Sequence, residues 1–277
     1  MKIALNINLK RRCFFYLVVF ILSFQTPARA ESPTDSGQST GKDSVDINID
    51  VESALSAYDT GDFAAAAKGF EQAWASGSHN GSLLFNLGNA HFKNNARGAA
   101  VAAYLAARDF LPRDAELLAN LQYVLNENQD NLPVQLRKSE LEKTLFFWLD
   151  SFSLSEAYWM FVTVLFFFFV ASTLCLYLKA KVVHRYVLLV SSALVILFAT
   201  MLANRLYFSP TWGAVIAPRA SLYSSPTMTS AVLFRLHEGA PVVLKQRQGD
   251  WIQLEFGDAK KAWIAAGEVR FYISKSE

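Results

Sequence analysis

Cysteine is nearly absent from this chain. Of its 277 residues only two are cysteine, Cys13 and Cys175. We expect Cys13 to be removed with an N-terminal segment, and Cys175 lies inside a long apolar run. The mature chain therefore cannot close an internal disulfide or hold a thiolate metal cluster, and its folded parts must be stabilised by their own cores.

Sequence signatures of catalysis are also missing. None of the four histidines has metal-ligand spacing, and there is no H-E-x-x-H, no phosphate-binding glycine loop and no G-x-S-x-G. The net charge of +2 is too small to create a field that attracts nucleic acid. We therefore expect no catalytic residue, no cofactor, no bound metal and no nucleic-acid partner, so the chain is not predicted to be an enzyme.

Two long apolar runs dominate what is present. Residues 157–178 and 186–206 are each about 20 residues long, which as helices would cross a bilayer core. Arg205 is their one formal charge and lies at an end, where it can reach the interface. The runs predict a two-helix transmembrane hairpin; the alternative is a pair of buried core helices.

Charge around the hairpin predicts its orientation. The connecting loop 179–185 carries Lys179, Lys181 and Arg185, whereas residues 144–156 before the hairpin carry no lysine or arginine. By the positive-inside rule the loop is expected to be cytoplasmic, which places both flanking parts outside.

The N-terminus resembles a secretory signal peptide. A basic stretch at residues 10–12 precedes a short apolar core, and Ala28-Arg29-Ala30 fits the cleavage pattern. We expect residues 1–30 to be removed after Ala30, although an uncleaved anchor is the alternative. Residues 31–46 are polar and lack apolar periodicity, which predicts a disordered linker.

An internal repeat follows, in two units of equal length, 47–80 and 81–114. The matching positions are Gly61, Phe63, Ala66, Phe70 and Ala73 in the first unit, and Leu87, Gly88, Ala100, Tyr104, Ala107 and Pro112 in the second. This pattern resembles the tetratricopeptide repeat, an all-α fold of paired antiparallel helices. The segment 115–126 is predicted to be a further helix that caps the repeat domain, 47–127; an alanine-rich bundle is the alternative reading.

Such a repeat lines a concave groove that can bind a peptide or a partner helix. By their repeat positions, the predicted groove residues are Phe85, Asn86, Asn89, Phe92, Lys93 and Asn120. Asparagine amides can both donate to and accept from a peptide backbone. The alternative for each residue is an ordinary polar position on a solvated face.

The C-terminal part has a different pattern. After a linker and interfacial segment at 128–156 and the hairpin, short strands with turn signals occupy residues 211–277, which predicts a small all-β barrel. The motifs at 222–226, 236–242, 249–252 and 262–264 resemble a bacterial SH3 domain. Asp250, Trp251 and Trp263 are its candidate surface residues, although packing in the core or rim is the more common role for the two tryptophans.

The order of these modules resembles the BatE proteins of bacterial aerotolerance operons. The resemblance implies a two-pass inner-membrane protein with both terminal domains in the periplasm. It also implies protein partners, namely membrane-tethered von Willebrand A domain proteins and, indirectly, a MoxR-type ATPase linked to envelope stress. Two functions remain open, a non-enzymatic scaffold that acts through the repeat groove and a peptidoglycan-binding sensor or anchor that acts through the SH3-like domain.

Overall fold

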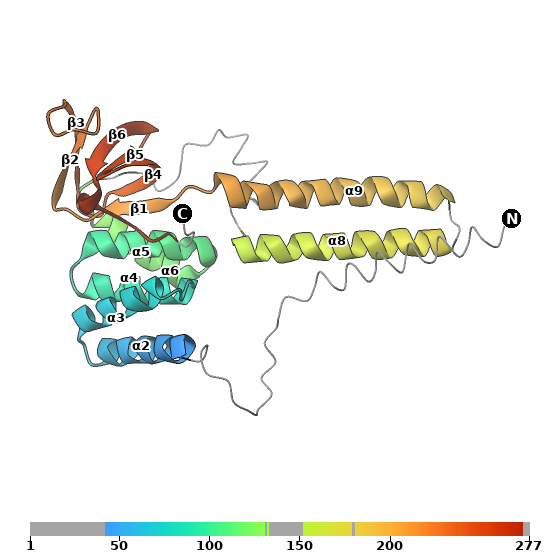
Figure 1. The fold of residues 1–277 in the computed structure, drawn as a ribbon, viewed down its shortest axis with the longest axis horizontal. Coiled ribbons are helices and arrows are strands. Elements are labelled where there is room, and N and C mark those ends of the chain that lie inside the picture. The colour runs from blue at the N-terminus through green and yellow to red at the C-terminus, as the bar shows by residue number, and fades with distance from the viewer. Residues whose placement is uncertain (1–41, 131, 133–151, 179–180, 274–277) are drawn as a thin grey trace. The chain divides into compact units, whose positions relative to one another are not determined.

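The computed structural model of this protein describes residues 42–130, 132, 152–178 and 181–273 (Figure 1). The predicted signal peptide 1–30, most of the linker 31–46 and most of the segment 128–156 lie outside the described residues. The chain divides into two compact units. One contains Val164–Val195, and the other contains Lys42–Thr163 together with Ile196–Glu277.

The N-terminal part of the second unit, here called the helical region, has five helices, as predicted. They are α2 (Lys42–Asp59), α3 (Phe63–Ala75), α4 (Gly81–Lys93), α5 (Arg97–Phe110) and α6 (Ala115–Asn126). The start of α5 follows that of α3 by one repeat period, and so does the start of α6 that of α4. Each helix packs against the next along the chain.

Local chemistry accounts for where these helices begin and end. The side chains of Asp62, Asn80 and Asp114 each accept a hydrogen bond from the backbone N–H three residues later, at 3.0, 2.7 and 2.9 Å. Gly61 and Asn95 occupy the same position in the two repeat units, and they end α2 and α4 with positive φ angles of 85° and 59°. Asparagine tolerates this conformation better than other residues with a side chain, which explains why it can replace glycine here.

The linker prediction needs one correction. Helix α2 begins at Lys42, so residues 42–46 belong to a helix and not to the expected linker 31–46. Ala54 of α2 is buried against α3, and a helix that is anchored in this way extends easily toward its N-terminus, because propagation costs far less than nucleation.

The two long apolar helices are also present, with boundaries that differ from those predicted. They are α8 (Leu154–Tyr177) and α9 (Lys181–Ala203), followed by a π-helical turn at Asn204–Phe208. Helix α8 begins three residues earlier than expected because Ser153 and Glu156 form a capping box: Glu156 N–H donates to Ser153 Oγ at 3.2 Å, and Ser153 N–H donates to Glu156 Oε2 at 2.8 Å. Helix α9 takes in residues 181–185 of the predicted loop 179–185, because nothing in that stretch breaks a helix.

The C-terminal part of the second unit, here called the SH3-like domain, is an antiparallel seven-stranded sheet. Its strands are β1 (Trp212–Val215), β2 (Arg219–Tyr223), β3 (Val232–His237), β4 (Pro241–Gln248), β5 (Trp251–Phe256), β6 (Lys260–Ala265) and β7 (Val269–Phe271), in the order β3-β2-β6-β5-β4-β1-β7. Alternate residues such as Leu222, Leu254 and Ile264 fill its core. The predicted C-terminal SH3-like fold is confirmed.

The helical region and the SH3-like domain share a hydrophobic core. Trp212, Ala214 and Val243 of the SH3-like domain belong to the core cluster of the helical region. Helix α5 packs against α4 and α6 as well as against β1 and β7. Figure 1 shows β1 beside α5. The sequence patterns had suggested two separate modules, but the second unit joins them.

Candidate functional site

A hollow of about 220 Å³ lies on the helical region, between α2, α4, α5 and α6. Four of the six predicted groove residues line it: Asn89, Phe92, Lys93 and Asn120. The remaining lining residues are Tyr58, Tyr104, Glu116, Tyr123 and Val124. Residues from α4 and α6, one repeat apart in the sequence, therefore meet at one hollow, which we call the groove.

The groove has a pre-organised polar floor. The hydroxyl of Tyr104 donates a hydrogen bond to Asn89 Oδ1 at 2.7 Å, and the Asn120 amide donates to the same oxygen at 3.1 Å. Burial raises the pKa of Tyr104, so this hydroxyl stays protonated and remains a donor. Because Asn89 Oδ1 is occupied, the Asn89 amide nitrogen is the part of that side chain that can donate to a ligand.

Aromatic rings and opposite charges complete the groove. The rings of Phe92 and Tyr123 meet edge to face with centroids 5.8 Å apart. The exposed side chains of Lys93 and Glu116 supply one positive and one negative charge. Such a surface can hold an apolar side chain, hydrogen-bond a peptide backbone and pair with a charged end.

Two of the predicted groove residues lie elsewhere. Phe85 and Asn86 do not line the hollow. Phe85 packs against the hydrophobic core, with its ring centroid 6.1 Å from that of Tyr104. Tyr104 can lie there because Gly88 has no side chain: a Cβ on Gly88 would come within 2.4 Å of the Tyr104 ring.

The three candidate residues of the SH3-like domain lie close together in the fold. Asp250 is exposed in the turn before β5, and Trp251 is half-buried. The ring of Trp251 meets that of Tyr223 edge to face at 5.4 Å, and Tyr223 pairs in register with Trp263. Trp263 is only 9% exposed, so packing accounts for most of its surface.

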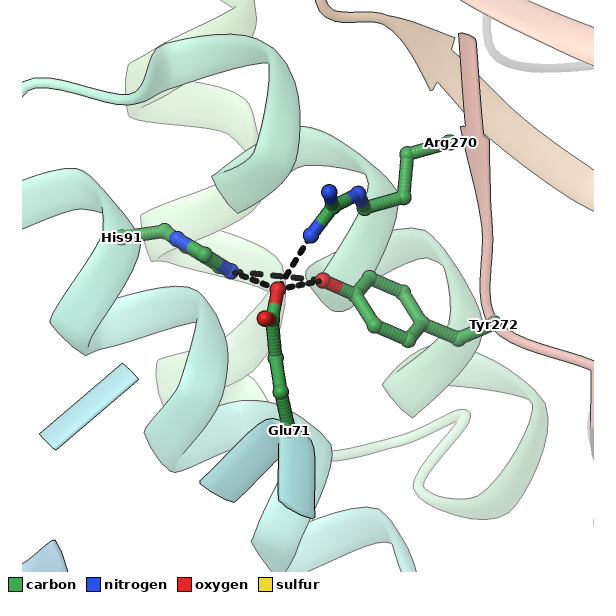
Figure 2. A network of polar contacts seen from close by, with 4 residues as sticks. All are labelled: Glu71, His91, Arg270 and Tyr272. Carbon is green, nitrogen blue, oxygen red and sulfur yellow. Dashed lines mark hydrogen bonds and ion pairs between the residues drawn. The ribbon is translucent and has the colours of Figure 1, made fainter. Parts of the chain in front are cut away.

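The helical region and the SH3-like domain are held together by a polar cluster that the sequence did not reveal. We call it the Glu71 network (Figure 2). Glu71 from α3 accepts hydrogen bonds from Arg270 in β7 and from the hydroxyl of Tyr272, the latter at 3.3 Å. His91 Nε2 from α4 lies 3.3 Å from Glu71 Oε1 and 3.3 Å from the Tyr272 hydroxyl.

The Glu71 network favours a charged carboxylate. The hydrogen bond from His91 and the positive charge of Arg270 lower the pKa of Glu71, and together they outweigh the opposite effect of partial burial. Burial raises the pKa of Tyr272, which keeps its hydroxyl protonated as a donor. The Glu71 network thus combines an ion pair between Glu71 and Arg270 with a hydrogen bond from the Tyr272 hydroxyl. It lies where the helical region meets the SH3-like domain.

A second set of contacts fixes α5 to the SH3-like domain. No side chain at Ala96 caps α5; instead, Glu238 Oε1 accepts a hydrogen bond from the Gly98 N–H at 2.9 Å. A Cβ on Gly98 would lie 2.2 Å from the Val215 carbonyl oxygen, so only glycine permits this approach. Just after α6, the Asn128 amide likewise donates to the Gly239 carbonyl of the SH3-like domain at 2.7 Å.

One sequence signal could have predicted that α5 packs against the SH3-like domain. Helix α5 reads RGAAVAAYLAARDF and has no polar face between Gly98 and Ala107, all of which are buried. A helix that is apolar on all sides must be surrounded, and its two neighbours α4 and α6 alone do not cover every side of α5. The residues of the Glu71 network offered no comparable signal, because charged residues of that kind occur on any helix surface.

No group of three or more His, Cys, Asp or Glu side chains that could hold a metal ion occurs in the part of the chain that the structure describes.

Comparison with known proteins finds one similarity. No curated protein and no solved structure matches the chain. Residues 217–270, which include β2 to β6, match the family of the bacterial SH3 domain.

Proposed function

We propose that this chain is a non-enzymatic, membrane-anchored scaffold whose tetratricopeptide-type groove binds protein partners outside the cytoplasm. The observation that carries the proposal is the groove itself. Its polar floor is fixed by the bonds of Asn89 to Tyr104 and Asn120, and its walls are aromatic. The resemblance to BatE proteins suggests membrane-tethered von Willebrand A domain proteins, with a MoxR-type ATPase, as the partner system.

The membrane placement is part of this proposal. Helices α8 and α9 have 24 and 23 residues, which as helices measure about 36 and 34 Å and exceed a hydrocarbon core of about 30 Å. Their length and composition alone support membrane crossing. A reporter enzyme fused to the C-terminus tests the orientation: activity in the periplasm is expected, and activity in the cytoplasm would refute it.

The groove is tested by crosslinking in native membranes. Full-length protein with Asn89→Ala and Lys93→Glu together is expected to lose the partners that the wild type captures, because a donor and a charge are removed from the groove. Lys68→Glu is the matched control, since Lys68 is also exposed on the helical region but lies outside the groove. If both variants capture the same partners as the wild type, the groove is not the binding surface.

A second candidate function is cell-wall binding through the SH3-like domain. The match of residues 217–270 to the bacterial SH3 family and the exposed side of its sheet favour it. The test is co-sedimentation of the detergent-solubilised full chain with purified peptidoglycan. The full chain is needed because Trp212, Ala214 and Val243 pack into the core of the helical region, so a C-terminal fragment would expose them.

A further inference from the structure

The outer side of the SH3-like sheet carries an ordered row of aromatic and amide side chains. The strand registers align Val232 of β3, Tyr223 of β2, Trp263 of β6, Gln253 of β5 and Gln246 of β4. Paired residues of adjacent strands point to the same side of a sheet. Because Leu222, Leu254 and Ile264 fill the core, the row lies on the opposite side. It crosses five strands and spans about 19 Å.

The next row enlarges this surface. Trp251 pairs with Gln248, and its ring meets that of Tyr223 at 5.4 Å. Arg235 pairs with Ser221 at one end of the sheet. We call the surface formed by these two rows and Lys261 the outer face; its members are Ser221, Tyr223, Val232, Arg235, Gln246, Gln248, Trp251, Gln253, Lys261 and Trp263.

Charge on the outer face is positive. Glu255 lies on the same side of the sheet, in register with Lys261, and its carboxylate forms an ion pair with Lys245 at 3.2 Å. Arg235 and Lys261 are exposed and form no ion pair with any residue that the structure describes. The face therefore has aromatic rings at its centre, glutamine amides beside them and cations at two positions, which complements a ligand that bears negative charge.

The kind of ligand follows from the hydrogen-bonding groups that are available. Except for Val232 of the edge strand β3, the row lies on inner strands whose backbone groups are used in the sheet ladders, so a ligand over the centre of this face can be read only by side chains. An extended peptide gains its affinity from backbone pairing at a sheet edge and would find none over the inner strands β2, β6, β5 and β4. Sugar hydroxyls both donate and accept, as glutamine amides do, and the apolar face of a sugar ring can lie on an aromatic ring.

We propose that the outer face binds an acidic glycan strand, a polysaccharide whose sugars carry carboxylates. The partly exposed rings of Tyr223 and Trp251 hold the sugar rings, the glutamines bind hydroxyls, and Arg235 and Lys261 pair with carboxylates. This inference rests on the second candidate function, for which it names the ligand and the surface.

The test uses the full chain in detergent and peptide-free glycan strands prepared from purified bacterial cell wall, whose muramic sugars carry carboxylates. Binding is followed by tryptophan fluorescence, because Trp251 and Trp263 are in the face. Lys261→Glu is expected to weaken binding about tenfold, as the loss of one charge-assisted contact predicts. Lys260→Glu is the matched control: its charge change is identical, but Lys260 pairs with Phe256 on the core-facing side and lies over the Phe234 ring.

Each outcome decides between alternatives. Loss of binding in Lys261→Glu with retention in Lys260→Glu supports the proposal. Equal weakening in both variants would mean a diffuse electrostatic attraction and would overturn it. Binding of polyglutamate but not of glycan strands would assign the face to an acidic peptide. If intact peptidoglycan co-sediments with the protein while glycan strands do not bind, cell-wall binding stands and the outer face is wrong; if neither binds, both proposals fail.

Discussion

Helices α5 and α8 both lack a polar face, yet their side chains have opposite surroundings. In α5 every residue from Gly98 to Ala107 is buried by protein. In α8 large side chains such as Phe167 and Leu174 are 62% and 53% exposed. The difference is one of size: the alanines of α5 let other elements approach closely, whereas the phenylalanines and leucines of α8 suit a lipid environment. An apolar helix must be surrounded, and side-chain size indicates by what.

The largest expected effect comes from placing a carboxylate in each helix. Ala103→Asp in α5 should destabilise the protein by more than about 4 kcal/mol, because an unpaired charge would be buried. Thermal unfolding of the detergent-solubilised protein measures this change. Ala119→Asp, at an exposed position of α6, is the control and should change stability little.

The same change in α8 should act on a different property. If α8 crosses the membrane as proposed, Phe167→Asp should leave thermal unfolding in detergent nearly unchanged and reduce the amount of protein in the membrane fraction, since a central aspartate costs about 3 kcal/mol on insertion. If Phe167→Asp unfolded the protein as Ala103→Asp does, the contrast between the two helices would be lost.

A smaller effect is expected where α5 touches the SH3-like domain. Gly98→Ala should cost about 1–3 kcal/mol, because the new methyl group would meet the Val215 carbonyl oxygen and force the two parts of the second unit to shift. Gly267→Ala provides a control, since nothing lies within 4 Å of the added atom. The denaturant midpoint of Gly98→Ala should be clearly lower than that of Gly267→Ala. Equal midpoints would show that the backbone around Gly98 accommodates a methyl group without loss of stability.

The caps of the two helices offer a further contrast. Ser153 belongs to the local capping box of α8, whereas α5 receives its cap from Glu238 in the SH3-like domain. Glu238→Ala and Ser153→Ala should each cost about 1 kcal/mol. Hydrogen exchange at the Gly98 amide should accelerate only in Glu238→Ala, and exchange at Glu156 only in Ser153→Ala. An unchanged exchange rate at the Gly98 amide in Glu238→Ala would show that the cap from the SH3-like domain does not stabilise α5.

The smallest effect concerns the Glu71 network. The folded-state pKa of Glu71 is lowered, so its contribution to stability is present above the ordinary carboxyl range and is lost as pH falls through the lowered value. Because this side chain is partly exposed, solvent screening limits the contribution to about 1 kcal/mol or less. Urea midpoints of the wild type and Glu71→Gln should differ at pH 7 and converge in acid; a difference that persists in acid would contradict an electrostatic role.

Local features were predictable from the sequence and distant contacts were not. Residues close together in the sequence encode the repeat period, helix caps such as Asp114 and the alternating pattern of the strands after Trp212. The boundary of α8 was missed although Ser153 and Glu156 have capping-box spacing. The Glu71 network joins residues 199 positions apart, and no short pattern encodes that distance. Helical spacing predicted that Asn89, Phe92 and Lys93 lie together, and they line one hollow, but it could not show that Phe85 packs in the core beside Tyr104.

The connection between the last helical turn and the sheet has a mechanical consequence. The π-helical turn ends at Phe208 and β1 begins at Trp212, so only residues 209–211 separate them. Three extended residues reach at most about 11 Å. If α9 crosses the membrane as proposed, the SH3-like domain has a very short tether and cannot search the space beyond the bilayer surface. Any wall polymer or protein that the SH3-like domain recognises must then lie at the membrane surface, and a force applied to that ligand would be transmitted directly to α9.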